Sequence, residues 1–310
     1  MSKDFQIILD EARELNLNIE IPPLGKQIAI ISDGKTEIII NELFHIENNQ
    51  YSEGYKLSKN KSLTYYLWEK NNIPFPRSTY FQNAEEASKS LDKIKFPLVA
   101  KENRGSRSIN VFSNIKTREE LFDILPNFKK GIVVQEMIFG KEYRILVYGD
   151  RILGCLKMTP PLVIGNGTNS IRNLVEQKNS TLRKKIVLSE KVISTIKKEG
   201  YSLDSILPKN ITVFLQNNSC LAEGGTSTDC TEFVHSSIKE LALKATRLVN
   251  LKLAGIDLIC EDISLPASEQ NISFLEINGH PSIDIHYFPS SGEKRVVAKD
   301  ILCDIFKIPQ

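Results

Sequence analysis

The sequence has 310 residues, of which 41% are hydrophobic and 25% are charged. At roughly 100–200 residues per domain, this length predicts about two domains, or one large composite domain, with a core that needs neither disulfides nor a structural metal. Forty Lys and Arg residues against 38 Asp and Glu residues give a net charge of +2, which argues against a dedicated DNA-binding protein and a polybasic membrane protein. No segment approaches the roughly 18 apolar residues of a transmembrane helix.

The N-terminal segment and the cysteines bear on location. The first residues mix charged and apolar side chains at helical spacing and lack the apolar region of a signal peptide. The cysteines are odd in number, widely spaced and free of Cys-x-x-Cys pairs: Cys155, Cys220, Cys230, Cys260 and Cys303. This pattern indicates reduced thiols and supports neither a zinc site nor a disulfide framework. We therefore expect a cytoplasmic protein without a nucleic-acid or membrane partner.

The N-terminal quarter begins with a predicted helix from Phe5 to Leu17, where apolar residues recur at helical spacing. Two predicted strands, Gln27–Ser32 and Thr36–Ile40, flank the hairpin turn signal Asp33-Gly34. The next predicted elements are a helix from Ser58 to about Lys70, an extended segment at 72–76, strands at Leu98–Lys101 and Ile109–Phe112, a helix at Thr117–Leu125, and strands at Ile132–Met137, Tyr143–Tyr148 and Arg151–Met158.

The second half begins with a more polar stretch, residues 159–210, that is only partly helical. The elements predicted here are helices at Ile171–Lys178 and Arg183–Glu199, a strand at Ile211–Leu215, a helix at His235–Val249, strands at Ala254–Cys260 and Ile272–Ile277, and a helix from about Glu293 to Phe306. Strands grouped in meanders favour α+β lobes over a regular βαβ arrangement. The GxGxxG fingerprint of dinucleotide-binding folds is absent.

Acidic residues interrupt two apolar strands near the C-terminus. Asp257 lies within Ala-Gly-Ile-Asp-Leu-Ile, and Glu276 and Asn278 lie within Phe-Leu-Glu-Ile-Asn-Gly. Residues two apart on a strand share a face, so Glu276 and Asn278 project the same way. If the strand of Asp257 is the neighbour, three oxygen ligands converge in a set that suits Mg²⁺ bound to substrate phosphates. The alternative is that Asp257 and Glu276 are ordinary polar residues on strand surfaces.

A basic and polar loop follows another strand. Lys101 ends the strand Phe-Pro-Leu-Val-Ala-Lys, and Glu-Asn-Arg-Gly-Ser-Arg-Ser comes directly after it. Backbone amides and guanidinium groups in such a loop can close over phosphate oxygens, although short loops of this kind are usually solvated turns. Lys61, Arg144 and Lys157 carry little information singly. Several cations together with Mg²⁺ are typical of phosphoryl-transfer sites.

Taken together, these segments resemble the ATP-grasp superfamily, and within it the ligase domain of cyanophycin synthetase and the glutathione-synthetase module of bifunctional glutathione enzymes. Four stretches carry the resemblance over about residues 56–308: Gly140-Lys-Glu-Tyr-Arg-Ile-Leu-Val, Val163-Ile-Gly-Asn-Gly-Thr-Asn-Ser, Gly224-Gly-Thr-Ser-Thr-Asp-Cys-Thr and Glu276-Ile-Asn-Gly-His-Pro with His286-Tyr-Phe-Pro. It implies an α+β ATP-grasp fold with two α+β lobes gripping ATP. It also implies a short N-terminal α/β segment at 1–55, an N-lobe at 56–133, and a C-lobe at 134–310 with a partly helical insert at about 165–210.

The resemblance also implies a role for each matching residue. Those implied to bind ATP are Lys61, Lys101, Ser106, Gln135, Glu136, Ile138 and Glu142. Asp257, Glu276 and Asn278 are implied to ligate Mg²⁺ or Mn²⁺, and Arg144 and Lys157 to lie near the γ-phosphate and the acyl phosphate as catalytic cations. Those implied to bind the other substrates are Gly224, Gly225, His286 and Arg295.

The implied activity is that of an ATP-dependent carboxylate–amine ligase, which forms a peptide or amide bond through an acyl phosphate and releases ADP and phosphate. The sequence departs from the family pattern at Gln216, Cys220 and Glu223, which leaves the amino-acid or small-peptide substrates open. An ATP-grasp small-molecule kinase and an ATP-binding protein without turnover are the alternatives. Because only about 55 residues precede the ligase segment and Gln310 ends the chain, we expect a stand-alone ligase, and the resemblance is compatible with a homodimer.

Overall fold

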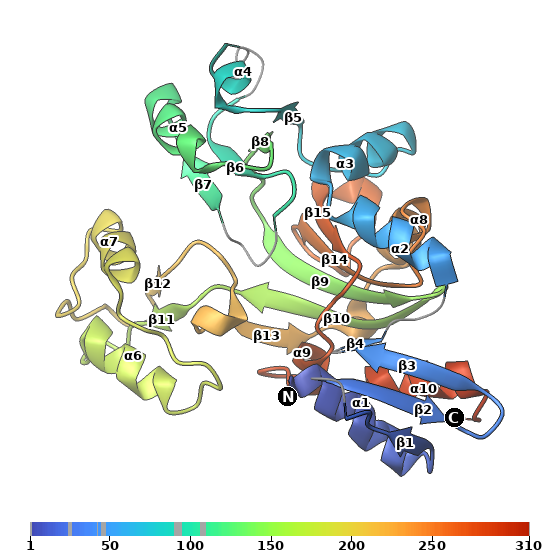
Figure 1. Cartoon of the computed structure of the whole chain (residues 1–310). Coiled ribbons are helices and arrows are strands. Elements are labelled where there is room, and N and C mark those ends of the chain that lie inside the picture. The colour runs from blue at the N-terminus through green and yellow to red at the C-terminus, as the bar shows by residue number, and fades with distance from the viewer. Residues whose placement is uncertain are drawn as a thin grey trace. The chain divides into compact units, whose positions relative to one another are not determined.

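The computed structural model describes residues 2–23, 27–41, 43–44, 48–89, 95–105 and 110–309, which fold into two compact units (Figure 1). The first unit comprises Met1–Leu156, Asp229–Phe288 and Glu293–Gln310, and the second comprises Lys157–Thr228 and Pro289–Gly292. Both contain helices and antiparallel strands, which confirms the predicted α+β class. The predicted boundaries at residues 55 and 133 stay a prediction.

The N-terminal part of the first unit is a helix beside a small sheet. Helix α1 (Lys3–Glu14) starts earlier than predicted because the Ser2 hydroxyl accepts a hydrogen bond from the Phe5 amide and caps the helix. Among the described residues the sheet has four antiparallel strands, in the order β1 (Asn18–Glu20), β2 (Ile28–Ser32), β3 (Glu37–Asn41) and β4 (Leu43–Phe44). The hairpin predicted at Asp33 is confirmed, since its carboxylate accepts from the amides of Lys35 and Thr36.

A second antiparallel sheet follows in the first unit, with the strand order β5-β8-β6-β7 in the described part of the chain. Its elements and the helices around it are α2 (Asn48–Ser58), α3 (Lys61–Lys70), β5 (Ser78–Phe81), α4 (Ala84–Lys89), β6 (Leu98–Glu102), β7 (Val111–Ile115), α5 (Arg118–Ile124) and β8 (Ile132–Glu136). The helix predicted from Ser58 to about Lys70 is found as α3, but its predicted start was wrong: Ser58 ends α2, and Asn60 caps α3 by accepting from the Leu63 amide. The strand predicted from Ile109 is found from Val111 onward, and Ile109 itself lies outside the described residues.

The central sheet has the strand order β13-β10-β9-β14-β15 within the described residues. Its elements and neighbouring helices are β9 (Lys141–Tyr148), β10 (Arg151–Thr159), β13 (Thr226–Asp229), α8 (Ser236–Leu248), β14 (Leu253–Cys260), β15 (Ile272–Asn278), α9 (Asp284–Tyr287) and α10 (Val297–Phe306). Strands β10 and β13 carry the chain into and out of the second unit. The helix predicted from Glu293 begins only at Val297, because the Arg295 amide donates to the His286 carbonyl instead of a helical partner.

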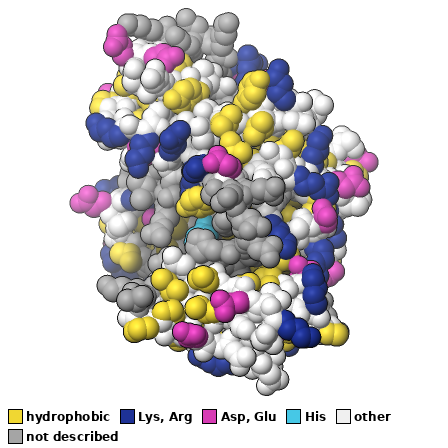
Figure 2. Space-filling view, turned by 45° about the vertical axis from the view of Figure 1, so that its right-hand side comes forward, with side chains coloured by type: hydrophobic (Ala, Val, Ile, Leu, Met, Phe, Trp, Pro, Cys, Tyr) yellow, Lys and Arg dark blue, Asp and Glu magenta, His cyan; other side chains and the backbone are white. Residues whose placement is uncertain are grey.

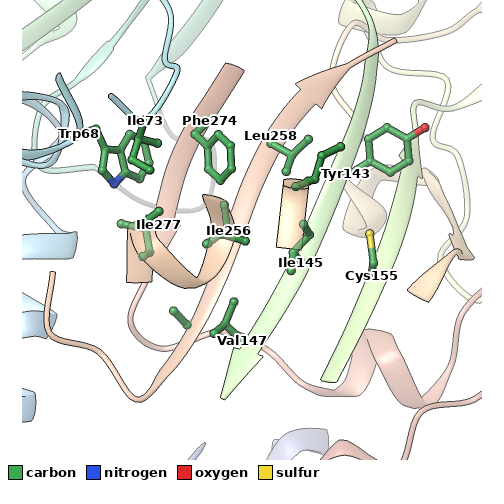
Figure 3. Close-up of a cluster of buried hydrophobic side chains, with 14 of the residues drawn as sticks. Trp68, Ile73, Tyr143, Ile145, Val147, Cys155, Ile256, Leu258, Phe274 and Ile277 are labelled. Atoms are coloured by element: carbon green, nitrogen blue, oxygen red, sulfur yellow. The ribbon is translucent and has the colours of Figure 1, made fainter. Parts of the chain in front are cut away.

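One face of the central sheet is apolar, and the opposite face carries charged and polar side chains. Figure 3 shows Ile145, Ile256 and Ile277 in a row across β9, β14 and β15, all within one buried apolar cluster that also contains Trp68 and Phe274. Because side chains alternate along a strand, the residues next to this row point to the opposite face. That opposite face carries the polar residues of the candidate site at one end of the strands.

On that opposite face, apolar residues fill the other end of the sheet. Leu146, Tyr148 and Leu253 belong to a core formed with α1, α10 and the strands β2 and β3. Figure 1 shows α1 and α10 side by side in this part of the first unit. The N-terminal helix is therefore built into the core beside the central sheet.

The second unit contains a two-stranded antiparallel ribbon and two helices in the part that is described. Its elements are β11 (Leu162–Ile164), α6 (Ile171–Asn179), α7 (Glu190–Lys198) and β12 (Thr212–Phe214). The helix predicted from Arg183 was too long: α7 begins at Glu190, because the Ser189 hydroxyl caps it by accepting from the Val192 amide. None of the described helices in either unit has the length and apolar character needed to cross a membrane.

Candidate functional site

A row of charged side chains crosses the polar face of the central sheet. Asp257 on β14 pairs in register with Arg144 on β9 and with Glu276 on β15. Arg144 binds Asp257 with two parallel hydrogen bonds, Nε to Oδ1 at 2.6 Å and Nη2 to Oδ2 at 2.8 Å. Asn278 follows on the same side of β15, and its Nδ2 donates to Asp257 Oδ2 at 3.4 Å. The hypothesis that the strand of Asp257 lies next to that of Glu276 is thus confirmed.

The oxygen atoms of this row form a donor set that fits a divalent cation. No cluster of three His, Cys, Asp or Glu side chains that could hold a metal ion is found among the described residues; the row combines two carboxylates with the side-chain amide of Asn278. Because Asn278 Nδ2 faces Asp257, its Oδ1 is left for another partner. Two carboxylates and an amide oxygen are the hard ligands that Mg²⁺ and Mn²⁺ take.

Lys61, the first residue of α3, brings a cation to the same row. Its ammonium lies 3.3 Å from Glu276 Oε1 and donates to the Gly105 carbonyl at 3.1 Å. Asn103 fixes this helix end, because its carbonyl accepts from the Lys61 amide and its side-chain oxygen accepts from the Ser62 amide. Burial lowers the pKa of Lys61, and the charge of Glu276 opposes that shift.

Tyr65, on the next turn of α3, connects three elements of the site. Its hydroxyl accepts from Lys101 Nζ at 2.9 Å and lies 2.6 Å from the Leu275 carbonyl and 3.1 Å from Gln135 Oε1. Lys101, Gln135 and Tyr65 are all buried. Burial lowers the pKa of Lys101 to about 8, although the negative charges of Glu276 and Asp257 oppose the shift. The lysine of β6 and the glutamine of β8 are therefore held against the backbone of β15.

The remaining residues predicted to bind ATP lie near this network or outside the described residues. Gln135 and Glu136 end β8, and the Glu136 amide donates to the Arg77 carbonyl at 2.9 Å. Ile138 is half-buried just beyond β8. Glu142 lies two residues before Arg144 on β9, so both point to the polar face. Ser106 lies outside the described residues.

Three predicted site residues belong to the second unit. Lys157 is half-buried on β10. The amides of Gly224 and Gly225 donate to the carbonyls of Leu221 and Cys220, respectively, so both are engaged within their own loop. Gly224 has a φ of +93°, and a Cβ atom at Gly225 would lie 3.0 Å from the Cys220 carbonyl oxygen. The loop therefore favours glycine at 224 by its backbone conformation and leaves little room for a side chain at 225.

His286 is fully buried on α9. Among the described residues, neither of its ring nitrogens has a hydrogen-bond partner. A Cβ atom on Gly154 of β10 would lie 2.5 Å from His286 Nδ1, so the glycine makes room for the ring. Burial, reinforced by the charge of Arg144, lowers the pKa of His286 to about 3 and keeps the ring neutral.

Arg295 is held by acidic side chains. It donates to Asp229 Oδ1 and Oδ2, at 3.2 and 2.7 Å, and to Glu232 at 2.7 Å. Thr231 donates to the same Asp229 carboxylate at 2.6 Å. Although burial opposes it, these hydrogen bonds lower the pKa of Asp229. The guanidinium that was predicted to line the acceptor pocket is thus neutralised within the chain.

Tyr65 and the two roles of Asn103 were not predicted from the sequence. A signal for Tyr65 was present, since it follows Lys61 by four residues in the same helix and residues at that spacing share a helix face. Nothing in the local sequence could have indicated that its hydroxyl meets Lys101, Gln135 and Leu275, which lie on three different strands.

Surface charge agrees with the small net charge of the chain. On the face shown in Figure 2, the Lys and Arg side chains of the described residues are interspersed with Asp and Glu side chains. Such an alternation differs from the basic stripe that is typical of nucleic-acid-binding proteins. The described residues on this face therefore form no basic stripe.

Comparisons with known proteins agree with this geometry. The family model of the RimK-like ATP-grasp domain matches residues 58–160. The bifunctional glutathione biosynthesis protein of Clostridium perfringens is 30% identical over 316 residues, covering 97% of this chain and 40% of that protein. Cyanophycin synthetase of a Synechocystis species is 30% identical over 270 residues, covering 82% of this chain and 31% of that protein.

A solved structure extends the likeness to the fold. The crystal structure of a bifunctional glutathione synthetase from Pasteurella multocida matches with a TM-score of 0.73 and 26% identity, over 99% of this chain and 44% of that one. The chain thus spans less than half the length of these relatives.

Proposed function

We propose that this chain, which belongs to the ATP-grasp superfamily by its fold and its RimK-like domain, is an ATP-dependent ligase that joins a carboxylate to an amine. A carboxylate oxygen attacks the γ-phosphorus of ATP, and ADP leaves. The amine then attacks the carbonyl carbon of the acyl phosphate, and phosphate leaves with the former carboxylate oxygen. Glutathione and cyanophycin synthesis, named for the relatives, support amino-acid or small-peptide substrates.

The observation that carries this proposal is the row formed by Arg144, Asp257 and Glu276, with Asn278 beside it. Asp257, Glu276 and Asn278 would hold Mg²⁺ or Mn²⁺, which when bound neutralises phosphate charge and draws electrons from the γ-phosphorus. Asp257 is only 13% exposed, so its charge is largely removed from water, which supports a role in binding a ligand.

The cations of the chain supply the rest of the electrostatic stabilisation. Lys61 pairs with Glu276, and Lys101 lies 3.4 Å from the carbonyl of the preceding residue, Leu275; at neutral pH both lysines would hold phosphate oxygens. Arg144 would stabilise the charge that develops on the transferred phosphoryl group. Lys157, carried by the second unit, stays the proposed second catalytic cation, and Gly224, Gly225, His286 and Arg295 stay proposed for the other substrates.

The test is release of ADP and phosphate from Mg²⁺-ATP in the presence of pooled amino acids and small peptides. Glu276→Gln removes a proposed ligand and should abolish release, while Glu269→Gln, an exposed glutamate of the same unit, is the matched control. Release that requires two members of a pool supports the ligase and identifies its substrates. Full activity of Glu276→Gln overturns the metal assignment.

Other outcomes separate the alternatives. Release with one carboxylate and no amine, together with a stable phosphorylated product, would indicate a kinase. ATP binding without release from any pool would contradict the ligase and favour a binding protein. Sedimentation of the purified chain tests whether it forms the homodimer with which the resemblance is compatible.

A further inference from the structure

Asp4, in the first turn of α1, reaches a segment 278 to 280 residues further along the chain. Its Oδ1 accepts from the amides of Ile283 and Asp284, at 2.9 and 2.7 Å, and Ser282 Oγ lies 3.0 Å from Oδ2. Burial raises the pKa of Asp4, and these hydrogen bonds oppose the shift. The half-buried carboxylate of Asp4 thus binds one short stretch of the chain, residues 282–284.

That stretch begins helix α9, which lacks a side-chain cap of its own. Asp4 takes over this function, because it accepts from the two backbone amides at the helix start. A further contact comes from the residue before Asp4, since Lys3 Nζ lies 5.8 Å from the centre of the Phe288 ring. The N-terminal helix therefore holds the segment at both ends of α9.

The held segment is directly joined to the candidate site. It leaves β15 after Asn278 and runs to Phe288, and it includes His286, whose ring lies against Gly154. Between them Pro281 is pressed onto β14, where a Cβ on Gly255 would lie 2.9 Å from Pro281 Cβ. Gly255 is two residues before Asp257 and shares its face of the sheet. The segment therefore covers the face that carries the polar row.

We propose that Asp4 is a positioning residue of the ligase site, which fixes residues 279–288 against the polar face of the sheet so that they form one wall of the acceptor pocket. This proposal rests on the proposed ligase function. Asp4 itself touches no reacting atom and acts through the backbone of Ile283 and Asp284. The N-terminal segment would then take part in recognition of the substrate that is joined to the acyl phosphate, and not in ATP binding.

The experiment compares Asp4→Ala, Asp4→Asn and Asp10→Ala in the full chain. Asp10 is an exposed residue of the same helix that pairs with Arg13, so it is the matched control. Each variant is assayed for ADP release with the substrate pair that supports release by the unmodified chain. Asp4→Ala should raise KM for the amine about tenfold or more while KM for ATP changes less than twofold. Asp4→Asn should raise KM for the amine much less than Asp4→Ala does, because its amide oxygen can still accept from both backbone amides.

Hydrogen exchange of the Ile283 and Asp284 amides gives a readout that does not depend on activity. Both amides should exchange faster in Asp4→Ala than in Asp10→Ala. If Asp4→Ala does not fold, Asp4→Asn and Ser282→Ala take its place, and a smaller rise in KM for the amine is expected from each. Unchanged KM values, or equal losses for amine and ATP, would overturn the proposal.

The two proposals fail in different ways. No release by the unmodified chain with any pool contradicts the ligase function, whereas unchanged exchange in Asp4→Ala contradicts the role of Asp4 whether or not the chain is active. Release by the unmodified chain combined with normal amine kinetics in Asp4→Ala would leave the ligase function standing and remove Asp4 from its machinery.

Discussion

Arg144 and Asp257 face each other across β9 and β14 and are joined by two hydrogen bonds of 2.6 and 2.8 Å. One was predicted to stabilise the transferred phosphoryl group and the other to ligate a metal ion. In this structure the two side chains instead form an ion pair with each other. The negative charge of Asp257 raises the pKa of Arg144, so the guanidinium stays charged throughout the accessible pH range. A bound cation would compete with Arg144 for the oxygens of Asp257 and release the guanidinium towards phosphate.

Replacing Arg144 by Lys should lower kcat by about 100-fold, because an ammonium cannot bind two oxygens in the parallel geometry of a guanidinium. The measurement is steady-state ADP release at saturating ATP, with circular dichroism to verify the fold. Arg247→Lys provides the control, since Arg247 forms an exposed ion pair with Asp150 in the same unit. An Arg144→Lys enzyme with normal kcat would show that two-oxygen binding has no part in catalysis.

Tyr65→Phe should lower the free energy of unfolding by about 1–3 kcal/mol, because it leaves buried polar atoms of Lys101, Gln135 and Leu275 without the hydroxyl they share. Denaturant unfolding measures the loss. Tyr66→Phe is the matched control on the same helix, since Tyr66 is 54% exposed, and its effect should stay within about 0.5 kcal/mol. Equal stabilities of the two variants would contradict a structural role for the Tyr65 network.

The affinity for ATP should fall as the pH rises above about 8. Burial lowers the pKa of Lys101 to about 8 in the free chain, so its ammonium is charged below this pH and becomes neutral above it. Since phosphate binding requires the charged form, Kd should increase by up to about tenfold per pH unit above 8. Calorimetric titration with ATP between pH 7 and 9.5 checks this. Lys101→Met should bind ATP more weakly at pH 7 and show a smaller pH dependence.

The free energy of unfolding should fall below about pH 6.5 because of His286. Its pKa is lowered from 6.5 to about 3 in the fold, so between these values the unfolded chain binds a proton that the folded chain excludes. Stability from this group is complete above pH 6.5 and decreases by up to about 1.4 kcal/mol for each pH unit below it. Unfolding of the chain and of His286→Leu at pH 4.5, 5.5 and 7.5 measures the difference. Parallel pH profiles of the two proteins would contradict a buried neutral imidazole.

The parts of the site that could be predicted are those that depend on local pattern. Glu276 and Asn278 share a face because they are two apart on a strand, and Asp257 reaches them because antiparallel neighbours of similar length pair in register. The resemblance to known ligases placed Lys61 and Lys101 on the right elements before their contacts were known. Most strands of the central sheet were predicted to within a few residues, since each is a strongly apolar run.

The parts that could not be predicted depend on contacts between distant segments. Three helices begin at residues other than those predicted, each next to a polar side chain that caps it: Ser2, Asn60 and Ser189. The partners of Tyr65 lie between 36 and 210 residues away, and those of Asp4 lie further still. No periodicity encodes such pairings, because they follow from how the sheets and helices pack after each has formed.

The tight contact between Gly154 and His286 links two positions that are distant in sequence. A methyl group at 154 would overlap the imidazole of His286, so Gly154→Ala alone should displace α9. The double variant Gly154→Ala, His286→Ser should leave α9 in place, because the smaller serine leaves room for the methyl group. The two positions should therefore vary together in natural relatives: a larger residue at 154 is expected only where 286 is small. Alignment of many relatives would thus reveal this contact as a correlated pair, and selection of 154 variants for activity should return compensating changes at 286.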